Sequence, residues 1–117
     1  MQQNNTSLGK LGEDLACEYL KKSHYKIIER NFRTKFGEID IIAKRKKQLV
    51  FVEVKYGSKD AYLRVNRKKF EKISFTAQMF LREKGDFGTN SYRIDVIAVT
   101  KEREIFHFED VAKDFWR

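Results

Sequence analysis

The sequence has no proline and only one cysteine, Cys17, among its 117 residues. A single cysteine excludes an intramolecular disulfide, so the core alone has to hold the fold together. Without proline, glycine and clusters of polar residues are the signals that mark turns and element ends. The low cysteine content is typical of a protein from a reducing compartment.

Long hydrophobic runs are also missing from the chain. Apolar runs such as 41–43 and 49–52 are far shorter than the ~18 residues that a membrane-spanning helix requires. The first 14 residues are polar and lack the apolar stretch of a secretory signal peptide. We therefore expect a cytoplasmic protein that does not associate with membranes.

Acidic residues are in the minority. The chain has 25 Lys and Arg against 17 Asp and Glu, a formal net charge of +8. Such an excess attracts polyanions and favours nucleic acid as a partner. A lysine-rich surface that serves only solubility is the alternative. Hydrophobic residues make up 41% and charged residues 36%, which indicates one globular domain over residues 1–117.

Hydrophobic periodicity predicts an α/β chain in the order helix, three strands, helix, two strands. This order favours a layered mixed sheet of about five strands flanked by helices. The expected ranges are, for the helices, 8–22, 65–84 and a short 110–117 and, for the strands, 25–32, 36–44, 48–56, 92–100 and 104–108.

The first helix is expected to begin after an N-cap at Thr6 or Ser7, with residues 2–6 frayed. Gly9 and Gly12 lie inside this helix, although an interior glycine costs ~1 kcal/mol relative to alanine. We expect both glycines to permit the close approach of a neighbouring strand.

The second and third strands carry charged side chains at alternate positions, which strand geometry places on one face. Glu38 and Asp40 share a face of the second strand, and Glu53 and Lys55 share a face of the third. The valines at 50, 52 and 54 then line the opposite face of the third strand. Half-exposed strands often carry Glu and Lys on their wet face, so a structural Glu38–Lys55 ion pair is the alternative to a site.

The turn between these strands determines which residues meet across the hairpin. A loop over 45–48 pairs Lys44 with Leu49 and sets Asp40 opposite Glu53. Two carboxylates with Cβ atoms ~5 Å apart repel each other, and burial raises that cost. A divalent cation removes both objections, and Mg²⁺ accepts one or two carboxylates while it keeps several waters. The pair is therefore a candidate site for phosphodiester hydrolysis.

The same residues carry a resemblance to a known superfamily. Gly37-Glu38-Ile39-Asp40, followed by Val52-Glu53-Val54-Lys55, resembles the D…ExK signature of the restriction-endonuclease-like PD-(D/E)xK proteins. Within that superfamily the chain resembles the uncharacterised YraN family and the archaeal-type Holliday-junction resolvases, over nearly its whole length. Further matches are Gly9-x-x-Gly12-Glu13-x-x-Ala16, Asn31-Phe32-Arg33, Lys69 and Arg93-Ile94-Asp95. The resemblance implies a three-layer restriction-endonuclease-like fold.

The resemblance also implies a role for each site residue. Asp40 and Glu53 would hold Mg²⁺ or Mn²⁺, together with the backbone carbonyl of Val54. Lys55 would position the attacking water or stabilise the charge on the phosphorane. Glu13 would reach the site from the first helix, directly or through water. From the sequence itself, a solvated helix residue is the alternative for Glu13.

Basic residues crowd the start of the second helix, where their charge opposes the helix dipole. A bound phosphate would offset this repulsion, so we expect these residues to contact nucleic acid. An ordinary solvated basic face is the alternative. The residues are Arg64, Arg67, Lys68, Lys69 and Lys72, with Tyr56 and Tyr62 nearby as candidates for base stacking.

The expected function is a Mg²⁺- or Mn²⁺-dependent endonuclease that acts on DNA, with branched or damaged DNA as candidate substrates. A non-catalytic nucleic-acid-binding module with the same fold is the first alternative. An interaction protein that docks a partner through Phe115 and Trp116 is the second. His24 and His107 have no metal-ligand spacing, so we expect them to be exposed or hydrogen-bonded. The oligomeric state is left open, and a homodimer is among the alternatives.

Overall fold

A computed structural model of the chain describes residues 2–60 and 65–114. The predicted order of helices and strands is confirmed, and element ends agree within two residues except for the first helix and the C-terminal helix. The elements are α1 (Gln2–Lys22), β1 (Lys26–Thr34), β2 (Gly37–Arg45), β3 (Gln48–Gly57), α2 (Arg67–Lys84), β4 (Ser91–Thr100), β5 (Ile105–Phe108) and a 3₁₀ turn (Val111–Asp114).

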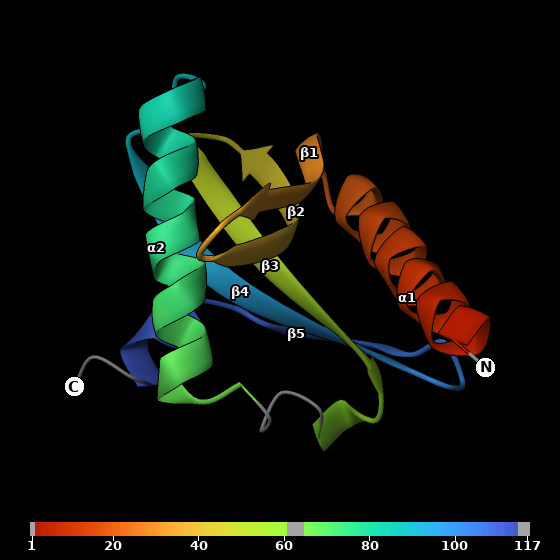
Figure 1. The fold of residues 1–117 in the computed structure, drawn as a ribbon. Coiled ribbons are helices and arrows are strands. Elements are labelled where there is room, and N and C mark those ends of the chain that lie inside the picture. Colours follow the sequence, from red (N-terminus) through yellow and green to blue (C-terminus); the bar gives the residue numbers. More distant parts are fainter. Residues whose placement is uncertain (1, 61–64, 115–117) are drawn as a thin grey trace.

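The five strands form one mixed sheet in the order β1-β2-β3-β4-β5. Only β3 and β4 run parallel, and α2 makes the crossover that a parallel pair requires; the other neighbours are antiparallel. The helices α1 and α2 cover opposite faces of the sheet (Figure 1). The expected layered α/β architecture is therefore confirmed.

Each face of the sheet has its own hydrophobic core. On one face Phe70 and Phe80 of α2 pack on Phe51, and on the other Ala16 and Leu20 of α1 pack on the strands. Neighbouring residues of β3 alternate between the two cores. The middle of β3 is thus buried on both faces, which explains its continuous apolar sequence.

Helix α1 differs from its prediction in two respects. It begins at Gln2, so the expected cap at Thr6 or Ser7 and the frayed residues 2–6 were wrong. Polar residues lower helix propensity by at most ~0.7 kcal/mol each, and no proline stops the helix here. Gly12 does permit a close approach, because a Cβ there would lie 3.3 Å from the Cβ of Tyr56. The same expectation for Gly9 was wrong, since a Cβ there would meet nothing within 4 Å.

The C-terminal helix expected over 110–117 is seen only as the 3₁₀ turn Val111–Asp114. Arg64 and Tyr62 lie outside the described residues, and so do Phe115 and Trp116. Neither α1 nor α2, as far as the structure describes them, has the length and apolarity needed to cross a membrane.

Candidate functional site

The ladder between β2 and β3 confirms the predicted register and ends beside the candidate site. Lys44 pairs with Leu49, and the same register continues to Ile41 opposite Val52. Asp40 comes next, and its Oδ2 accepts a hydrogen bond from the backbone N–H of Val54 at 2.7 Å. A side-chain carboxylate thus takes over as acceptor where the pairing of β2 with β3 stops, and this fixes the position of Asp40 between the two strands.

Asp40 and Glu53 line one cavity of about 250 Å³ between the sheet and α2. Glu53 turns toward α2, whereas Val54 packs into the core under α1. Lys69 and Lys72 of α2 line the same cavity. Period-two alternation along β3 and the hairpin register therefore bring both carboxylates to one place, together with basic residues from the helix above.

Asp40 has an unusual charge state in this position. Burial raises its pKa to about 8, and the nearby carboxylates of Glu53 and Glu13 add to the shift. The hydrogen bond from Val54 N–H opposes the rise without cancelling it. A pKa of about 8 favours the protonated form of Asp40 near neutral pH in the absence of a cation, and a hydrogen bond with Glu53 contributes to the shift.

Two lysines approach these carboxylates. Lys55 Nζ lies 3.2 Å from Glu53 Oε2, and the two side chains are only 14% and 12% exposed. Lys69 hydrogen-bonds Lys55, and this contact, together with burial, lowers the pKa of Lys69. The start of α2 therefore does more than present a basic surface, since one of its lysines belongs to the carboxylate cluster.

Glu38 does not pair with Lys55, the partner expected in the structural alternative. Its Oε1 lies 3.4 Å from Arg33 Nε, and its Oε2 accepts a hydrogen bond from Asn31 Nδ2 at 3.0 Å. Among the contacts of the described residues, Lys55 pairs with Glu53 instead. The Glu38–Lys55 ion pair was therefore wrong in that form.

Glu13 approaches the site from α1. Its two carboxylate oxygens accept hydrogen bonds from Asn31 Nδ2 at 3.1 and 3.2 Å, and Arg30 Nη2 lies 3.4 Å from Oε1. Glu13 and Asp40 both line a second cavity of about 500 Å³. A freely solvated Glu13 was therefore the wrong alternative, although its catalytic role stays a prediction.

Sequence reasoning missed Asn31 as the bridge between Glu13 and Glu38. The residue has a φ of 54°, a left-handed conformation that asparagine tolerates better than most residues. An asparagine inside a predicted strand, next to its last residue, was the available signal, because asparagine is depleted in strands.

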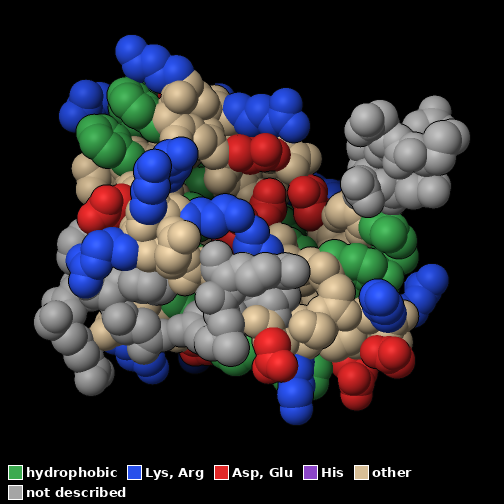
Figure 2. All heavy atoms as spheres, turned by 60° about the horizontal axis from the view of Figure 1, so that its bottom comes forward, with side chains coloured by type: hydrophobic (Ala, Val, Ile, Leu, Met, Phe, Trp, Pro, Cys, Tyr) green, Lys and Arg blue, Asp and Glu red, His purple; other side chains and the backbone are tan. Residues whose placement is uncertain are grey.

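Further basic residues lie at the start of α2, next in sequence to Lys69, which lines the cavity. Asn66 caps the helix by accepting a hydrogen bond from Lys69 N, and the first turn holds no acidic residue to balance the dipole. Lys68 and Lys72 line a neighbouring groove, and Arg67 is the first residue of the helix. Figure 2 shows Lys and Arg side chains beside a group of acidic side chains on one face of the molecule.

The oxygen donors fit a hard divalent cation, but they are few. Within residues 2–60 and 65–114, no three His, Cys, Asp or Glu side chains are arranged to hold a metal ion. The available set is the carboxylates of Asp40 and Glu53, with the backbone carbonyl of Val54 as the predicted third donor. Mg²⁺ commonly takes one or two carboxylates, and Mn²⁺ accepts the same donors. The repulsion between the carboxylates of Asp40 and Glu53, which adds to the raised pKa of Asp40, is a repulsion that a cation would relieve.

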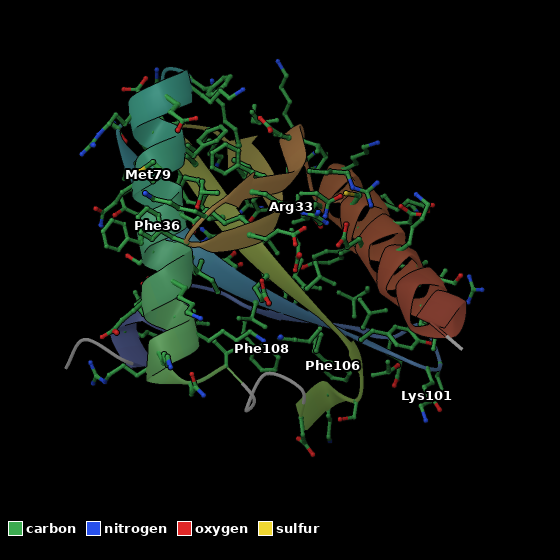
Figure 3. All side chains as sticks on the ribbon, viewed as in Figure 1. Arg33, Phe36, Met79, Lys101, Phe106 and Phe108 are labelled. Carbon is green, nitrogen blue, oxygen red and sulfur yellow. The ribbon has the colours of Figure 1, made fainter. Side chains whose placement is uncertain are left out.

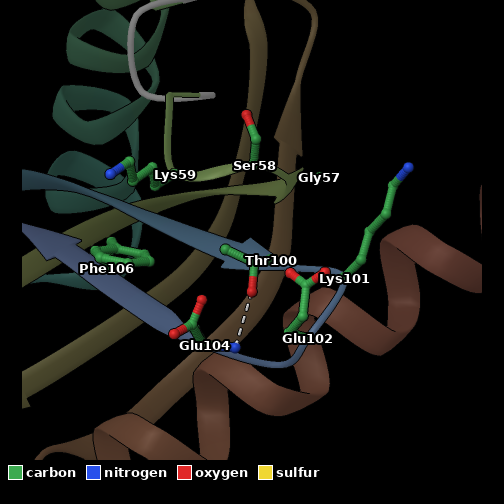
Figure 4. Close-up of a pocket in the computed structure, with 8 residues that line it drawn as sticks. All are labelled: Gly57, Ser58, Lys59, Thr100, Lys101, Glu102, Glu104 and Phe106. Carbon is green, nitrogen blue, oxygen red and sulfur yellow. Dashed lines mark hydrogen bonds between the residues drawn. The ribbon is translucent and has the colours of Figure 1, made fainter.

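A larger cavity, of about 700 Å³, lies elsewhere among the described residues (Figure 4). It is formed where β3 and β4 end, and Thr100 Oγ1 accepts a hydrogen bond from Glu104 N beside it at 3.0 Å. Its described lining includes none of the candidate residues.

A buried polar network lies on the α1 side of β4. Asp95 is fully buried and accepts hydrogen bonds from Arg93 and from the backbone N–H of Asp110, and His107 Nε2 lies 2.6 Å from its Oδ2. His107 Nδ1 lies 2.9 Å from the hydroxyl of Tyr19. The expectation of a hydrogen-bonded or exposed His107 is confirmed, and the network is satisfied within the protein.

The fold and the cavity define an α/β domain with paired carboxylates under a basic helix, and comparison with known proteins identifies its family. The model of a family described as "Uncharacterised protein family UPF0102" matches residues 12–99, so the chain belongs to this family. The predicted membership of the YraN family, which is UPF0102, is thus confirmed. The matched region contains Glu13, Asp40, Glu53 and Lys55.

Matches to relatives from several bacteria cover most of this chain. A UPF0102 protein of Thermotoga neapolitana is 48% identical over 99 residues, which are 83% of this chain and 90% of the relative. One from Thermotoga maritima is 45% identical over 104 residues, 87% of this chain and 94% of the relative. One from Campylobacter lari is 45% identical over 94 residues, 78% of this chain and 81% of the relative.

Proposed function

We propose that this protein is a divalent-metal-dependent endonuclease of the PD-(D/E)xK class that hydrolyses phosphodiester bonds in DNA. The observation that carries the proposal is the convergence of Asp40 and Glu53 on one cavity beside Lys55 and Lys69. Two carboxylates and the amine of Lys69 in one small cavity, with the amine of Lys55 on Glu53, form a site that can hold a cation and a phosphate together.

Asp40 and Glu53 would hold the cation with the backbone carbonyl of Val54. A bound Mg²⁺ or Mn²⁺ supplies Lewis-acid polarisation of the phosphate and lowers the pKa of a bound water. The hydrogen bond from Val54 N–H keeps Asp40 in one orientation. Glu13, held by Asn31 at the rim of the second cavity, is placed to contact water that enters beside Asp40.

The lysines supply positive charge where a phosphodiester gains negative charge during hydrolysis. Lys55 Nζ contacts Glu53 and, as an ammonium group, has further N–H donors for a phosphate oxygen or the attacking water. Lys69 and Lys72 line the same cavity and would bind the phosphates on either side of the reacting bond. The net charge of +8 favours a polyanionic substrate.

A non-catalytic nucleic-acid-binding module is the second candidate function. The proton on Asp40 and the Lys55–Glu53 ion pair already neutralise the cluster without a cation. In that case the lysines of α2 would bind the polynucleotide and the carboxylates would serve only the fold.

A cleavage screen separates the two functions. Fluorescently labelled single-stranded, duplex, flap and four-way DNA are incubated with the protein and Mg²⁺, Mn²⁺ or EDTA. We expect cleavage with Mg²⁺ or Mn²⁺, none with EDTA, and none with Asp40→Asn or Glu53→Gln. Lys84→Ala, an exposed lysine at the far end of α2, is the matched control and is expected to cleave normally. If the protein binds DNA but cleaves none of the four substrates, it is the non-catalytic nucleic-acid-binding module instead.

A further inference from the structure

Two exposed phenylalanines stack on each other beside the candidate site. The rings of Phe36, in the β1–β2 turn, and Phe75, on α2, have centroids 4.8 Å apart and an interplanar angle of 13°. Phe36 is 37% and Phe75 54% exposed. Phe36 lies against α2, on the side away from α1 (Figure 3). The described part of the chain leaves much of this aromatic surface open to a ligand.

The fold itself brings this pair together. A Cβ at Gly37 would lie 3.3 Å from Thr76 Oγ1 and 3.7 Å from Lys72 Cβ, so the turn packs tightly on α2. The hydroxyl of Thr76 is turned back onto the carbonyl of Lys72 at 2.8 Å. Glycine at 37 thus permits the approach that places Phe36 on Phe75.

Positive charge surrounds the aromatic pair. The two rings line a groove of about 420 Å³ together with Lys35, Lys68, Glu71 and Lys72. Lys35 Nζ lies 5.4 Å from the centroid of the Phe36 ring. Three lysines and one glutamate leave an excess of positive charge beside an apolar, flat surface. A ligand that fits both features has a flat ring and negative charge.

The groove and the carboxylate cavity are neighbours. Lys72 lines both of them, and Gly37 forms part of the cavity wall next to Phe36. A polynucleotide whose phosphate enters the cavity can therefore place an adjoining nucleotide in the groove.

We infer that the Phe36–Phe75 groove binds an unpaired nucleotide, with its base stacked on Phe75 and its phosphate held by Lys68 and Lys72. The inference rests on the proposed function in taking DNA as the polynucleotide. It deepens that function, because only a strand with an unstacked base can use the groove. The substrate class is then DNA with a single-stranded segment, such as a free strand, a flap or an opened junction, in preference to a blunt duplex.

Binding measured without catalysis tests this inference. Fluorescence anisotropy with a single-stranded oligonucleotide and with the blunt duplex of the same sequence, both in EDTA, compares the full-length protein with Phe75→Leu. Leucine keeps an apolar side chain but removes the ring. Phe87→Leu is the matched control, because Phe87 is also exposed and stacked on a phenylalanine, Phe80, but does not line the groove. Thermal unfolding verifies that each variant is folded.

We expect Phe75→Leu to weaken single-strand binding about tenfold, the loss typical of one stacked base, and duplex binding by less than about twofold. The dependence of affinity on salt is expected to stay unchanged, since the phosphate contacts remain. A 2-aminopurine base in the strand is expected to be quenched by the wild-type protein and less so by Phe75→Leu. Phe75→Trp, which restores a ring, is expected to restore affinity.

Equal binding of single strands by the wild-type protein and Phe75→Leu would overturn the inference, and so would an equal loss for strand and duplex. Unchanged DNA binding with a changed sedimentation mass would instead identify the aromatic pair as a protein-docking surface. Binding is measured in EDTA and so does not depend on cleavage. If the wild-type protein cleaves no DNA but Phe75→Leu still loses affinity for the single strand, only the nuclease proposal is refuted. If the wild-type protein cleaves DNA but Phe75→Leu binds the single strand as the wild type does, only the binding of a nucleotide in the groove is refuted.

Discussion

Asp40 lies one residue beyond the end of the β2–β3 ladder, and its side chain accepts a 2.7 Å hydrogen bond from the backbone N–H of Val54. This bond holds the Asp40 carboxyl next to that of Glu53, although burial and the second carboxylate raise its pKa to about 8. The charge state of Asp40 is therefore linked both to the stability of the fold and to the binding of a cation.

The raised pKa of Asp40 predicts that Asp40→Asn stabilises the metal-free protein at high pH. The pKa is about 8 in the folded state and about 4 in the unfolded state, so the folded state holds the proton more tightly. Stability from this group is thus fully present below about pH 4 and is lost as pH rises through about 8. Asparagine keeps an acceptor for Val54 N–H and has no proton to lose.

Urea unfolding in EDTA measures this effect. We expect the wild-type protein and Asp40→Asn to be of similar stability near pH 4.5, and Asp40→Asn to be more stable by ~4 kcal/mol near pH 8.5. Asp60→Asn, at an exposed position, is the control and should change stability little at either pH. A variant that is less stable than wild type at the higher pH would show that Asp40 is charged and well satisfied.

Lys55 and Asp40 are expected to fail in different ways when they are replaced. Lys55→Ala removes an amine but leaves both carboxylates, so cleavage is lost while stabilisation by Mn²⁺ persists. Asp40→Asn removes the negative charge and one of the two side-chain oxygens that would hold the cation, so both cleavage and stabilisation by Mn²⁺ are lost. Thermal unfolding with and without Mn²⁺, beside the cleavage assay, makes the comparison. If Lys55→Ala unfolds the protein while Asp40→Asn functions normally, the Lys55–Glu53 pair is a purely structural contact.

Reversing charge on α2 is expected to weaken DNA binding generally. In Lys68→Glu/Lys69→Glu, fewer phosphates are neutralised, so affinity should fall for every sequence and its dependence on salt should flatten. Lys46→Glu/Lys47→Glu makes the same charge change at the β2–β3 turn, at the opposite end of the hairpin from Asp40, and should have a smaller effect. Anisotropy titrations at several salt concentrations provide the slopes. Equal slopes for the two double variants would mean that α2 is not the contact surface.

The network around Asp95 is expected to serve stability alone. Burial acts to raise the pKa of Asp95, but hydrogen bonds from His107, Arg93 and Asp110 N–H outweigh it, so the pKa is lowered. Asp95→Asn leaves Arg93 without its buried partner and should reduce the free energy of unfolding by ~3 kcal/mol at pH 7. Because the folded-state pKa is depressed, the difference should shrink below about pH 4.

Urea unfolding at neutral and acid pH, together with a DNA-binding titration, checks this expectation. Tyr19→Phe removes only the hydroxyl that contacts His107 and should cost about 1 kcal/mol. Normal stability of Asp95→Asn combined with lost DNA binding would place the network in the functional site.

Local rules were enough to predict the hairpin. The loop over 45–48 and period-two facing were sufficient to pair Lys44 with Leu49 and to bring Asp40 and Glu53 to one cavity. The helical stripe of α2 was equally readable, because Phe70 and Phe80 recur at helical spacing and are buried.

Contacts that depend on how one helix or strand lies over another could not be predicted from the sequence. The Phe36–Phe75 stack requires the β1–β2 turn to meet α2, which no periodicity specifies. The bridge by Asn31 depends on a left-handed residue inside a strand. Gly9 and Gly12 look alike in the sequence, yet only Gly12 faces a strand closely.

Asp40 and Glu53 are expected to bind one divalent cation together, and calorimetric titration with Mn²⁺ measures this binding. At pH 7, in two buffers of different ionisation enthalpy, we predict one saturable site that releases close to one proton per cation, because Asp40 with a pKa of about 8 must lose its proton to bind. Asp40→Asn and Glu53→Gln should each abolish or strongly weaken this binding. A cation site formed by Asp40 and Glu53 would be contradicted by an absence of saturable Mn²⁺ binding, or by binding that both variants leave unchanged.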